Sequence, residues 1–319
     1  MSQKGLSTKF PYVLSYDLGG TKVEVGVVNS SGKVLECLRT PVLFKEGKSA
    51  VIRQLADLGQ QMISKYPKIK RVGIASAGPL EPKTGILLDP TNFSGPEGAW
   101  GKTPLAQMLG RKLKLPVFME NDAAAAILAE HWVGAARNSQ NAMILTLGTG
   151  LGTGIIVNGE LVRSGRDLHP EAGHLILEYN DESAPCGCGN NGCAEAYLSG
   201  RNFTRRARVK MGNDKLEAPE IANMARAGDF NARAMFDEYA FLMAVAIHNY
   251  AVIYAPELVI FTGSFAQAAD LFMKKTQAHL EKLLARRRVG VDLLPKLKTS
   301  KLHNNAGLIG GAFVAFTRA

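Results

Sequence analysis

Cysteine is scarce in this sequence, and long apolar runs are missing from it. Only four of the 319 residues are cysteine, and three of these crowd into the segment from Cys186 to Cys193. Such crowding is not the pattern of a disulfide framework, but it is typical of a metal site. No stretch approaches the ~18–20 apolar residues that a membrane span needs, and the N-terminal residues lack the apolar core of a signal peptide. We therefore expect no membrane partner and a cytoplasmic location.

The sequence also lacks the features of a nucleic-acid-binding protein, although it is basic. Its formal net charge is +10, but no helix-turn-helix segment or basic arm precedes the first predicted strand at Tyr12. We interpret the positive charge as favouring solubility and attracting an anionic ligand, and we expect no nucleic-acid partner.

A repeated pattern organises the chain, whose length is enough for two domains. Strand, Gly/Thr-rich turn, strand, Asn/Gly-containing turn and strand follow one another from Tyr12 and again from Ala142. We interpret the repeat as two similar α/β lobes; the alternative is that β-hairpins recur in any α/β protein. Further predicted elements are helices over 48–66, 105–113, 123–131, 216–253, 265–287 and 306–319, strands over 71–74, 116–120 and 258–261, and a long ordered loop over 75–101.

Two glycine-rich turns occupy corresponding positions of this repeat. The first covers residues 17–22 (Asp-Leu-Gly-Gly-Thr-Lys), and the second runs from Gly148 to Gly154. Glycine lets backbone N–H groups approach an anion, and the carboxylate of Asp17 could hold Mg²⁺. Each turn alone could be a tight hairpin, but the matched pair suggests a phosphate chain held by two lobes.

Asp122 stands where a predicted strand gives way to an alanine-rich helix. The N-terminus of a helix favours an ionised carboxylate, so Asp122 would be available as a proton acceptor at neutral pH. The competing interpretation is that Asp122 only caps the helix, which is a common role for aspartate.

The strongest local signal is a set of residues with the composition of a tetrahedral zinc site: His174, Cys186, Cys188 and Cys193. If all four bind zinc, no coordination position is left for water, so we expect a structural metal. Glu171 and Glu195 flank the set, and a metal would hold their carboxylates near each other, as a site for a polyhydroxylated ligand requires. The alternative is that these cysteines are reactive or merely buried.

Taken together, these motifs resemble the ROK family of bacterial sugar kinases and repressors, within the actin-like ATPase fold. The resemblance covers nearly the whole chain and rests on residues 17–22, Glu120-Asn121-Asp122, Gly148 to Gly154 with Asn158-Gly159, Glu171 to His174, and Cys186 to Glu195. It implies two lobes built on duplicated ribonuclease H-like domains, with ATP and sugar in the cleft between them. We expect a small α/β lobe over 1–121 and 304–319, and a large one over 122–303 with the zinc-binding segment.

The resemblance implies that the γ-phosphate of ATP, bound with Mg²⁺, moves to the 6-hydroxyl of a hexose, with Asp122 as catalytic base. His174 would be shared between zinc and sugar through its two ring nitrogens. It also implies a homodimer. The sugar-binding positions it implies are Gly78, Asn121, Asp122, Glu171, His174 and Glu195. The nucleotide-binding positions it implies are Asp17, Gly19, Gly20, Thr21, Lys22, Gly148, Thr149, Gly150 and Gly263.

Glucose is the favoured sugar, because Asn, two Glu and His suit the hydroxyls of an unmodified hexose. N-acetylmannosamine, N-acetylglucosamine and fructose stay open, since the same positions serve all of them. Ser164, Pro170, Ala77 and a lengthened loop over 92–100 depart from the family pattern near the expected sugar site. A repressor would need a DNA-binding domain before Tyr12, where only eleven residues stand, so we expect a kinase rather than a repressor. A non-catalytic sugar sensor is the remaining alternative, and the presence of Asp122 argues against it.

Overall fold

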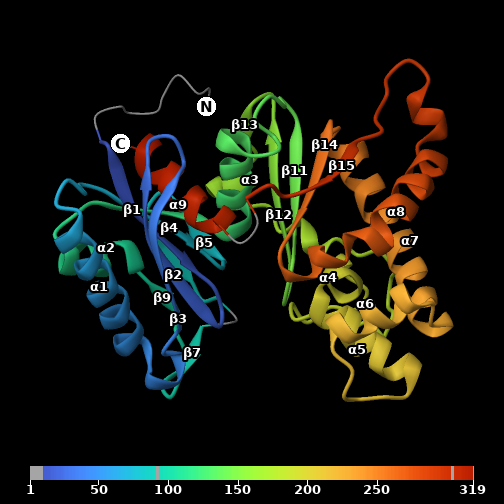
Figure 1. Cartoon of the computed structure of the whole chain (residues 1–319), viewed down its shortest axis with the longest axis horizontal. Coiled ribbons are helices and arrows are strands. Elements are labelled where there is room, and N and C mark those ends of the chain that lie inside the picture. The colour runs from blue at the N-terminus through green and yellow to red at the C-terminus, as the bar shows by residue number, and fades with distance from the viewer. Residues whose placement is uncertain (1–9, 91–92, 303–304, 319) are drawn as a thin grey trace. The chain divides into compact units, whose positions relative to one another are not determined.

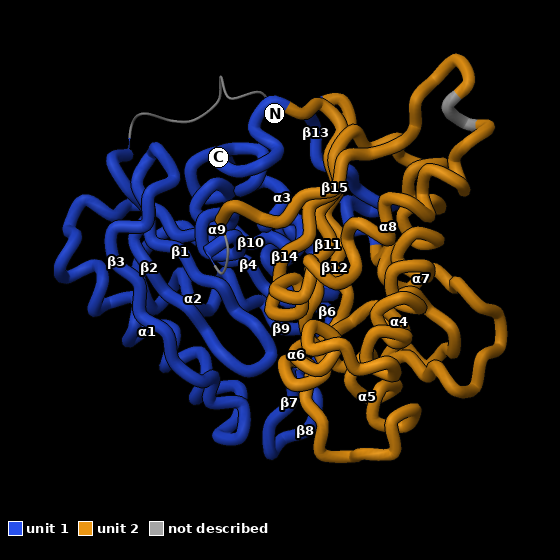
Figure 2. The backbone as a smooth tube through the Cα atoms, turned by 45° about the vertical axis from the view of Figure 1, so that its right-hand side comes forward, with its two compact units in different colours: residues 1–138, 159–170, 304–319 blue, residues 139–158, 171–303 orange. Residues whose placement is uncertain are grey.

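The structure is a computed structural model that describes residues 10–90, 93–302 and 305–318. Its contacts group the chain into two compact units (Figure 2). Unit 1 comprises Met1–Asn138, Gly159–Pro170 and Asn304–Ala319, and unit 2 comprises Ser139–Asn158 and Glu171–His303. Among the described residues, no helix combines the length and the apolar composition needed to cross a membrane.

Unit 1 is built on a five-stranded sheet in the order β10-β4-β1-β2-β3, of which Figure 1 labels β1 to β4 and Figure 2 also labels β10. β1 (Tyr12–Leu18), β2 (Lys22–Asn29) and β3 (Val34–Pro41) form an antiparallel meander, as the sequence predicts. β4 (Val72–Ser76) and β10 (Val117–Asn121) extend the sheet in parallel with β1. The alternation of β1 divides its side chains between two layers of helices.

On one face of β1, Leu14, Tyr16 and Leu18 enter the apolar core with α1 (Lys48–Lys65) and α2 (Leu105–Leu113). On the other face, the hydroxyl of Ser15 donates to the Leu308 carbonyl of α9 at 2.6 Å. α9 (Ala306–Thr317) packs on the strands and also on α3 (Asp122–Val133). A Cβ added to Gly73 would lie 1.8 Å from the Gly311 carbonyl oxygen, so glycine at both positions lets α9 approach the sheet closely.

The segment 75–101, predicted as one long loop, contains short strands instead. Residues 91 and 92, and with them the start of the predicted 92–100 loop, lie outside the described residues. The strands are β5 (Leu80–Glu81), β6 (Ile86–Leu88), β7 (Ser94–Gly95) and β8 (Gly98–Ala99), and β9 (Lys102–Thr103) follows the segment directly. Phe44, Phe93 and Trp100 pack on one another beside them, with ring centroids 4.8–5.5 Å apart.

Unit 2 repeats the strand pattern of unit 1. β11 (Ala142–Leu147) pairs antiparallel with β12 (Leu151–Val157) and parallel with β14 (Leu258–Thr262), just as β1 pairs with β2 and β4. The predicted repeat is therefore present. β15 (Lys296–Thr299), which the sequence reasoning missed, lies parallel beside β14. β13 (Glu160–Leu161) follows β12 in the chain.

The helices of unit 2 are α4 (Ala194–Leu198), α5 (Gly200–Met211), α6 (Ala218–Ala227), α7 (Phe230–Tyr254) and α8 (Ala269–Leu283). The predicted helix over 216–253 is broken in two. Gly228 ends α6 in the left-handed conformation at φ 102°, and the side chain of Asp229 caps α7 by accepting from the Ala232 N–H.

The compact units divide the chain differently from the predicted lobes between residues 122 and 170. We expected residue 122 to begin the large lobe, but residues 122–138 and 159–170 group with unit 1. The physical reason is that α3 follows β10 directly and packs along α9. Asp122 therefore belongs to the same unit as the turn over residues 17–22.

Candidate functional site

Three strand ends of unit 1 meet at one edge of its sheet. In the register of the parallel strands, Leu18 and Asn121 both pair with Ser76. The turn over residues 17–22, the loop that begins at Ser76 and the β10–α3 junction therefore leave the sheet together. This edge collects the following predicted residues: Asp17, Gly19, Gly20, Thr21, Lys22, Gly78, Asn121 and Asp122.

Asn121, and not Asp122, caps helix α3. Its side-chain oxygen accepts from the N–H groups of Ala123 and Ala124 at 3.0 and 3.1 Å. Asp122 is the first residue of the helix, and its Oδ1 accepts from the adjacent Ala123 N–H at 2.8 Å. The cap interpretation of Asp122 is thus overturned: its carboxylate stands at the positive end of α3, with the capping role filled by its neighbour.

Asp17 experiences an excess of negative charge. Burial raises its pKa to about 7, and the carboxylates of Asp122 and Glu24 add to the shift, while Lys22 and Arg39 oppose it. Two carboxylates, Asp17 and Asp122, thus lie close enough to repel each other at the sheet edge. Such a place favours a bound cation.

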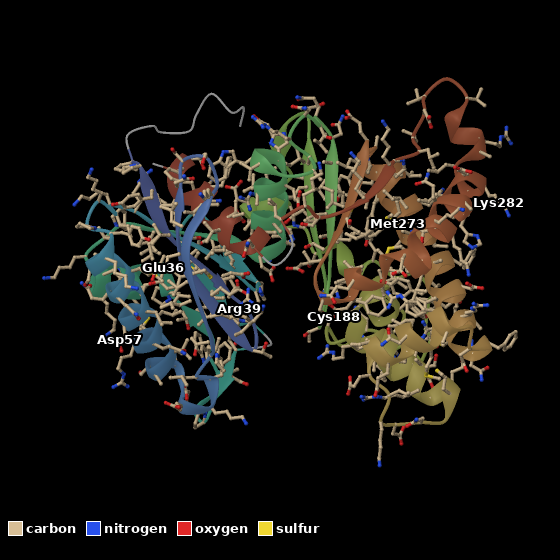
Figure 3. All side chains as sticks on the ribbon, in the orientation of Figure 1. Glu36, Arg39, Asp57, Cys188, Met273 and Lys282 are labelled. Atoms are coloured by element: carbon tan, nitrogen blue, oxygen red, sulfur yellow. The ribbon has the colours of Figure 1, made fainter. Side chains whose placement is uncertain are left out.

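Lys22 is paired with a buried carboxylate. Its Nζ lies 2.9 Å from Glu24, which also accepts from Arg39 at 2.8 Å. Glu24 is 1% exposed, whereas the two cations are half-exposed. Arg39 extends from β3 (Figure 3) and pairs with Glu24 across the sheet. Sequence reasoning missed Glu24 and Arg39. Glu24 had a signal, because the alternation of β2 places it on one face with the predicted Lys22.

The cysteine cluster of unit 2 has the dimensions of a zinc site. One ligand atom from each of His174, Cys186, Cys188 and Cys193 lies within 4.8 Å of all the others. The Cys186 sulfur is 3.4 Å from His174 Nδ1, and the sulfurs of Cys188 and Cys193 are 3.7 Å apart. Zinc–ligand bonds of about 2.0–2.3 Å in tetrahedral geometry imply ligand separations of about 3.3–3.8 Å, so the residues fit the metal.

Glu171 and Glu195, which flank the cluster in sequence, both lie beside it in the structure. Glu195 Oε2 accepts from the Leu151 N–H at 3.0 Å, and its Oε1 lies 3.6 Å from the Cys186 sulfur. Desolvation raises the pKa of Glu171, with the Glu195 carboxylate adding to the shift and His174 opposing it. The structure thus brings Glu171, His174 and Glu195 together, beside the start of β12.

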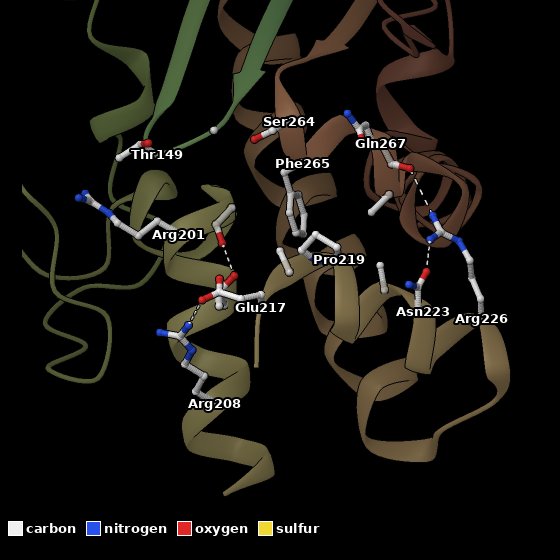
Figure 4. A pocket seen from close by; sticks show the side chains of 16 residues that line it. Thr149, Arg201, Arg208, Glu217, Pro219, Asn223, Arg226, Ser264, Phe265 and Gln267 are labelled. Carbon is white, nitrogen blue, oxygen red and sulfur yellow. Dashed lines mark hydrogen bonds and ion pairs between the residues drawn. The ribbon is translucent and has the colours of Figure 1, made fainter. Parts of the chain in front are cut away.

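A cavity of about 610 Å³ opens in unit 2 next to the second glycine-rich turn (Figure 4). Gly148 and Thr149 line it, and Ser264 stands where Gly263 was expected. One ion pair and one hydrogen bond join residues of its walls: Arg208 pairs with Glu217 at 2.6 Å, and Arg226 donates to Asn223 at 3.3 Å. The other lining residues are Gly200, Arg201, Thr204, Ala218, Pro219, Ala222, Phe265, Gln267 and Ala268.

Sequence reasoning missed most of this cavity. Its walls come from α5, α6 and the turn after β14, and their side chains carry no motif. A usable sequence signal was the pair Ser199-Gly200, at which α5 starts. The start of α5 reaches the second glycine-rich turn, since the Arg201 N–H donates to the Gly148 carbonyl at 3.4 Å. Gly263 itself is required by the backbone, since its φ is +92° and a Cβ would lie 2.4 Å from the Leu147 carbonyl.

Comparisons with known proteins agree with this architecture. A model of the ROK family matches residues 13–318. The chain is 32% identical over 316 residues to a glucokinase of Thermotoga maritima, covering 95% of this chain and 96% of that protein. It is 29% identical over 307 residues to an N-acetyl-D-glucosamine kinase of Aliivibrio salmonicida, covering 94% and 98%.

A solved structure supports the same assignment. A ROK family glucokinase from Streptomyces griseus, in complex with glucose and AMPPNP, superposes with a TM-score of 0.78 at 27% identity, covering 95% of this chain and 99% of that one. The α/β fold expected from the resemblance is confirmed. This chain belongs to the ROK family.

Proposed function

We propose that this protein is a glucokinase that transfers the γ-phosphate of ATP to the 6-hydroxyl of glucose. The observation that carries the proposal is the sheet edge of unit 1, where the Asp122 carboxylate lies at the N-terminus of α3 beside Asp17 while Asn121 caps the helix. The relatives named glucokinase support the choice of sugar. A kinase for N-acetylglucosamine is the second candidate, supported by relatives of that name.

In this reaction Asp122 is the proton acceptor. The 6-hydroxyl oxygen forms a bond to the γ-phosphorus, the bond from that phosphorus to the bridging oxygen of ADP breaks, and the hydroxyl proton goes to the Asp122 carboxylate. The N-terminus of α3 stabilises the ionised form of Asp122 before the sugar arrives.

Asp17 would hold Mg²⁺. Its carboxylate is a hard oxygen ligand of the kind this ion prefers, and a cation would offset the burial and the repulsion by Asp122 and Glu24 that together raise its pKa to about 7. When bound, Mg²⁺ neutralises the developing charge on the phosphates. The Gly19 N–H closes this turn by donating to the Lys22 carbonyl at 3.1 Å. We assign the backbone N–H groups of Gly20 and Thr21, together with the Lys22 side chain, to the phosphates.

The remaining proposed ligand contacts come from residues of both units. We assign the hydroxyls of the sugar to Gly78, Asn121, Glu171, His174 and Glu195. In Asn121 the amide nitrogen is the donor for this purpose, since the oxygen caps α3.

We assign Gly148, Thr149 and Gly150 as further contacts of the ATP phosphates. We assign the nucleoside of ATP to the cavity beside Gly263, because its volume of about 610 Å³ is within the usual range for such ligands. The expectation that sugar and ATP bind between the two lobes stays a prediction, as does the cytoplasmic location.

The cluster of three cysteines and one histidine would hold a structural zinc ion. Burial raises the pKa of the Cys186 and Cys193 thiols, and a metal would reverse this by stabilising the thiolates. With Nδ1 of His174 directed at the sulfur atoms, Nε2 is the nitrogen available to the sugar.

The proposed activity is tested by a coupled assay of ADP release with glucose, N-acetylglucosamine, N-acetylmannosamine and fructose. We expect the highest kcat/KM with glucose. A higher kcat/KM with N-acetylglucosamine would replace the proposal by its second candidate, and no ADP release with any sugar would reject the kinase. We also propose a homodimer, which sedimentation equilibrium at micromolar concentration tests directly.

A further inference from the structure

The residue before Asn121 and Asp122 is a fully buried carboxylate shared by two arginines. Glu120 is 0% exposed, and Arg163 and Arg318 reach it from the segment after β13 and from the end of α9. The three residues are far apart in sequence but lie within unit 1. None of them belongs to the motifs assigned to substrate above, except that Glu120 begins the Glu-Asn-Asp run.

The hydrogen bonds of this cluster are nearly saturated. Glu120 Oε1 accepts from Arg163 Nη1 at 2.9 Å, and Oε2 accepts from Arg163 Nη2 and from Arg318 Nη2. Arg318 Nη1 donates in addition to the carbonyls of Met119 and, at 3.2 Å, Pro82. Arg163 thus makes a two-pronged contact, and Arg318 ties Glu120 to its own strand and to the loop after β5.

The cluster is coupled to the proposed base through the backbone. The Asn121 N–H donates to Glu120 Oε1 at 2.9 Å, so the carboxylate that the arginines fix also fixes the last peptide of β10. Asn121 in turn caps α3 with its side chain, and Asp122 is the first residue of that helix. Displacing Glu120 would therefore shift Asn121 and Asp122 together.

Stability is a weak reason for such a cluster. A buried ion pair loses its hydration, and apolar replacements of similar volume are often as stable or more stable. The cluster instead fixes the orientation of the Glu120 side chain, because the planar guanidinium group of Arg163 binds both oxygens of its carboxylate.

We propose that Arg163 and Arg318 are positioning residues, which act through Glu120 to hold Asn121 and Asp122 in the orientation used for proton transfer. This inference rests on the proposed function of Asp122. It adds to that function a support built from two distant segments of the chain.

Arg318→Met is the variant that tests the proposal, and Arg71→Met is its matched control. Arg71 also donates to a carbonyl of α9, that of Ala315 at 3.0 Å, and stacks on Phe118 of β10, but it does not contact Glu120. We expect Arg318→Met to lower kcat by about 10- to 100-fold, because a small misplacement of a reacting group costs that much. The KM for glucose should change by less than about threefold, and Arg71→Met should keep the wild-type kcat.

Conservative variants guard against misfolding. Arg318→Lys and Arg163→Lys keep the charge but lose the planar fork. The kcat of each should lie between those of Arg318→Met and the wild type, and each should fold as the wild type does by circular dichroism. Combining Arg318→Met with Glu120→Gln should lower kcat no further than the more severe single variant, because both act on one group. Wild-type kcat in Arg318→Met, an equal loss in Arg71→Met, or fully multiplicative losses in the double variant would each overturn the proposal.

A readout without turnover separates this inference from the proposed function. Hydrogen exchange at the Asn121 amide should be at least about tenfold faster in Arg318→Met than in the wild type, since Glu120, which accepts from this amide, is then held by Arg163 alone. Arg71→Met should leave this amide unchanged. If the wild type phosphorylates no sugar, the proposed function fails while the exchange result still decides the positioning. If exchange at Asn121 is unchanged, the positioning fails whatever the activity.

Discussion

Asn121 and Asp122 divide two roles that one aspartate could have filled. Both side chains suit the start of a helix, and Asn121 takes the capping hydrogen bonds from Ala123 and Ala124. The Asp122 side chain accepts from the N–H of its neighbour Ala123 and is not the N-cap of the helix. The carboxylate can therefore be removed without uncapping α3.

This separation makes Asp122→Asn an informative substitution. We expect turnover to fall by at least about 10³-fold, because the variant lacks the proton acceptor that also orients the attacking hydroxyl. The thermal midpoint should stay within a few degrees of the wild type, since the cap of α3 is intact. Single-turnover kinetics and differential scanning calorimetry measure the two quantities. Turnover near that of the wild type would show that another group accepts the proton.

Asp17 should make the protein less stable as the pH rises. Its pKa is about 7 in the folded chain, above its ordinary value of 3.8, so the folded state binds more protons than the unfolded state between these values. The free energy of unfolding therefore falls as the pH increases from about 4 to about 7, by at most about 4 kcal/mol.

Asp17→Asn, which stays neutral, should remove this loss. Its free energy of unfolding should exceed that of the wild type by an amount that grows from pH 4 to pH 7 and is constant above. Urea denaturation at several pH values, without Mg²⁺, measures the difference. A difference that does not vary with pH would contradict the assignment. The same variant should lose Mg²⁺-dependent activity.

Among the elements, we expect the segment from His174 to Cys193 to depend on a bound metal more than on an apolar core. Cys188 is exposed and glycines surround it, so little apolar burial holds the segment in place. A metal that joins four side chains would supply the missing stability.

We expect about one zinc ion per freshly purified chain. Cys188→Ala should lose the metal and lower the thermal midpoint, because three ligands bind zinc far more weakly than four. Cys37→Ala is the matched control, since Cys37 is also exposed but lies on β3, outside the cluster. Metal analysis by mass spectrometry and thermal unfolding provide the measurements. A wild-type protein without zinc would refute the metal site.

The packing of α9 in unit 1 depends on the absence of side chains. A Cβ at Gly310 would lie 2.0 Å from the Ala125 carbonyl of α3, so the two helices would have to separate. Gly310→Ala should lower the free energy of unfolding by about 1–3 kcal/mol, the usual cost of overpacking.

Gly110→Ala in α2 provides the comparison, because its added Cβ would lie 3.1 Å from the nearest atom. There, helix propensity and mild crowding should nearly cancel, leaving a change within about 1 kcal/mol. Equal destabilisation by the two substitutions in urea titrations would contradict the packing argument.

At the scale of the whole molecule, bound sugar should stabilise the fold by mass action. Glucose at 100 times its Kd should raise the free energy of unfolding by about 2.7 kcal/mol, provided that it binds only the folded chain. A thermal-shift titration with glucose and N-acetylglucosamine measures this effect for both candidates. Stabilisation by N-acetylglucosamine at lower concentrations than by glucose would favour the second candidate.

The strand repeat shows how far local patterns reach. Alternation and turn residues predicted both hairpins, since a hairpin is set by neighbours in sequence. β15 was missed because its four residues, Lys296–Thr299, are mostly exposed and show no apolar alternation. The pair Gly228-Asp229 is a sequence signal for the break between α6 and α7, because glycine often ends a helix and aspartate often caps the next one. The single helix predicted over 216–253 runs across this pair.

By itself, the sequence determined the α/β class and the repeat, and it predicted the zinc-ligand set and the candidate base. These depend on residue types at short spacings, which act through local geometry. Only the tertiary structure decided that Leu18, Ser76 and Asn121 leave one sheet edge together, and that Asn121 rather than Asp122 caps α3. It alone joined Arg163 and Arg318 to Glu120. Contacts between residues so far apart depend on strand order and helix packing, which no local pattern encodes.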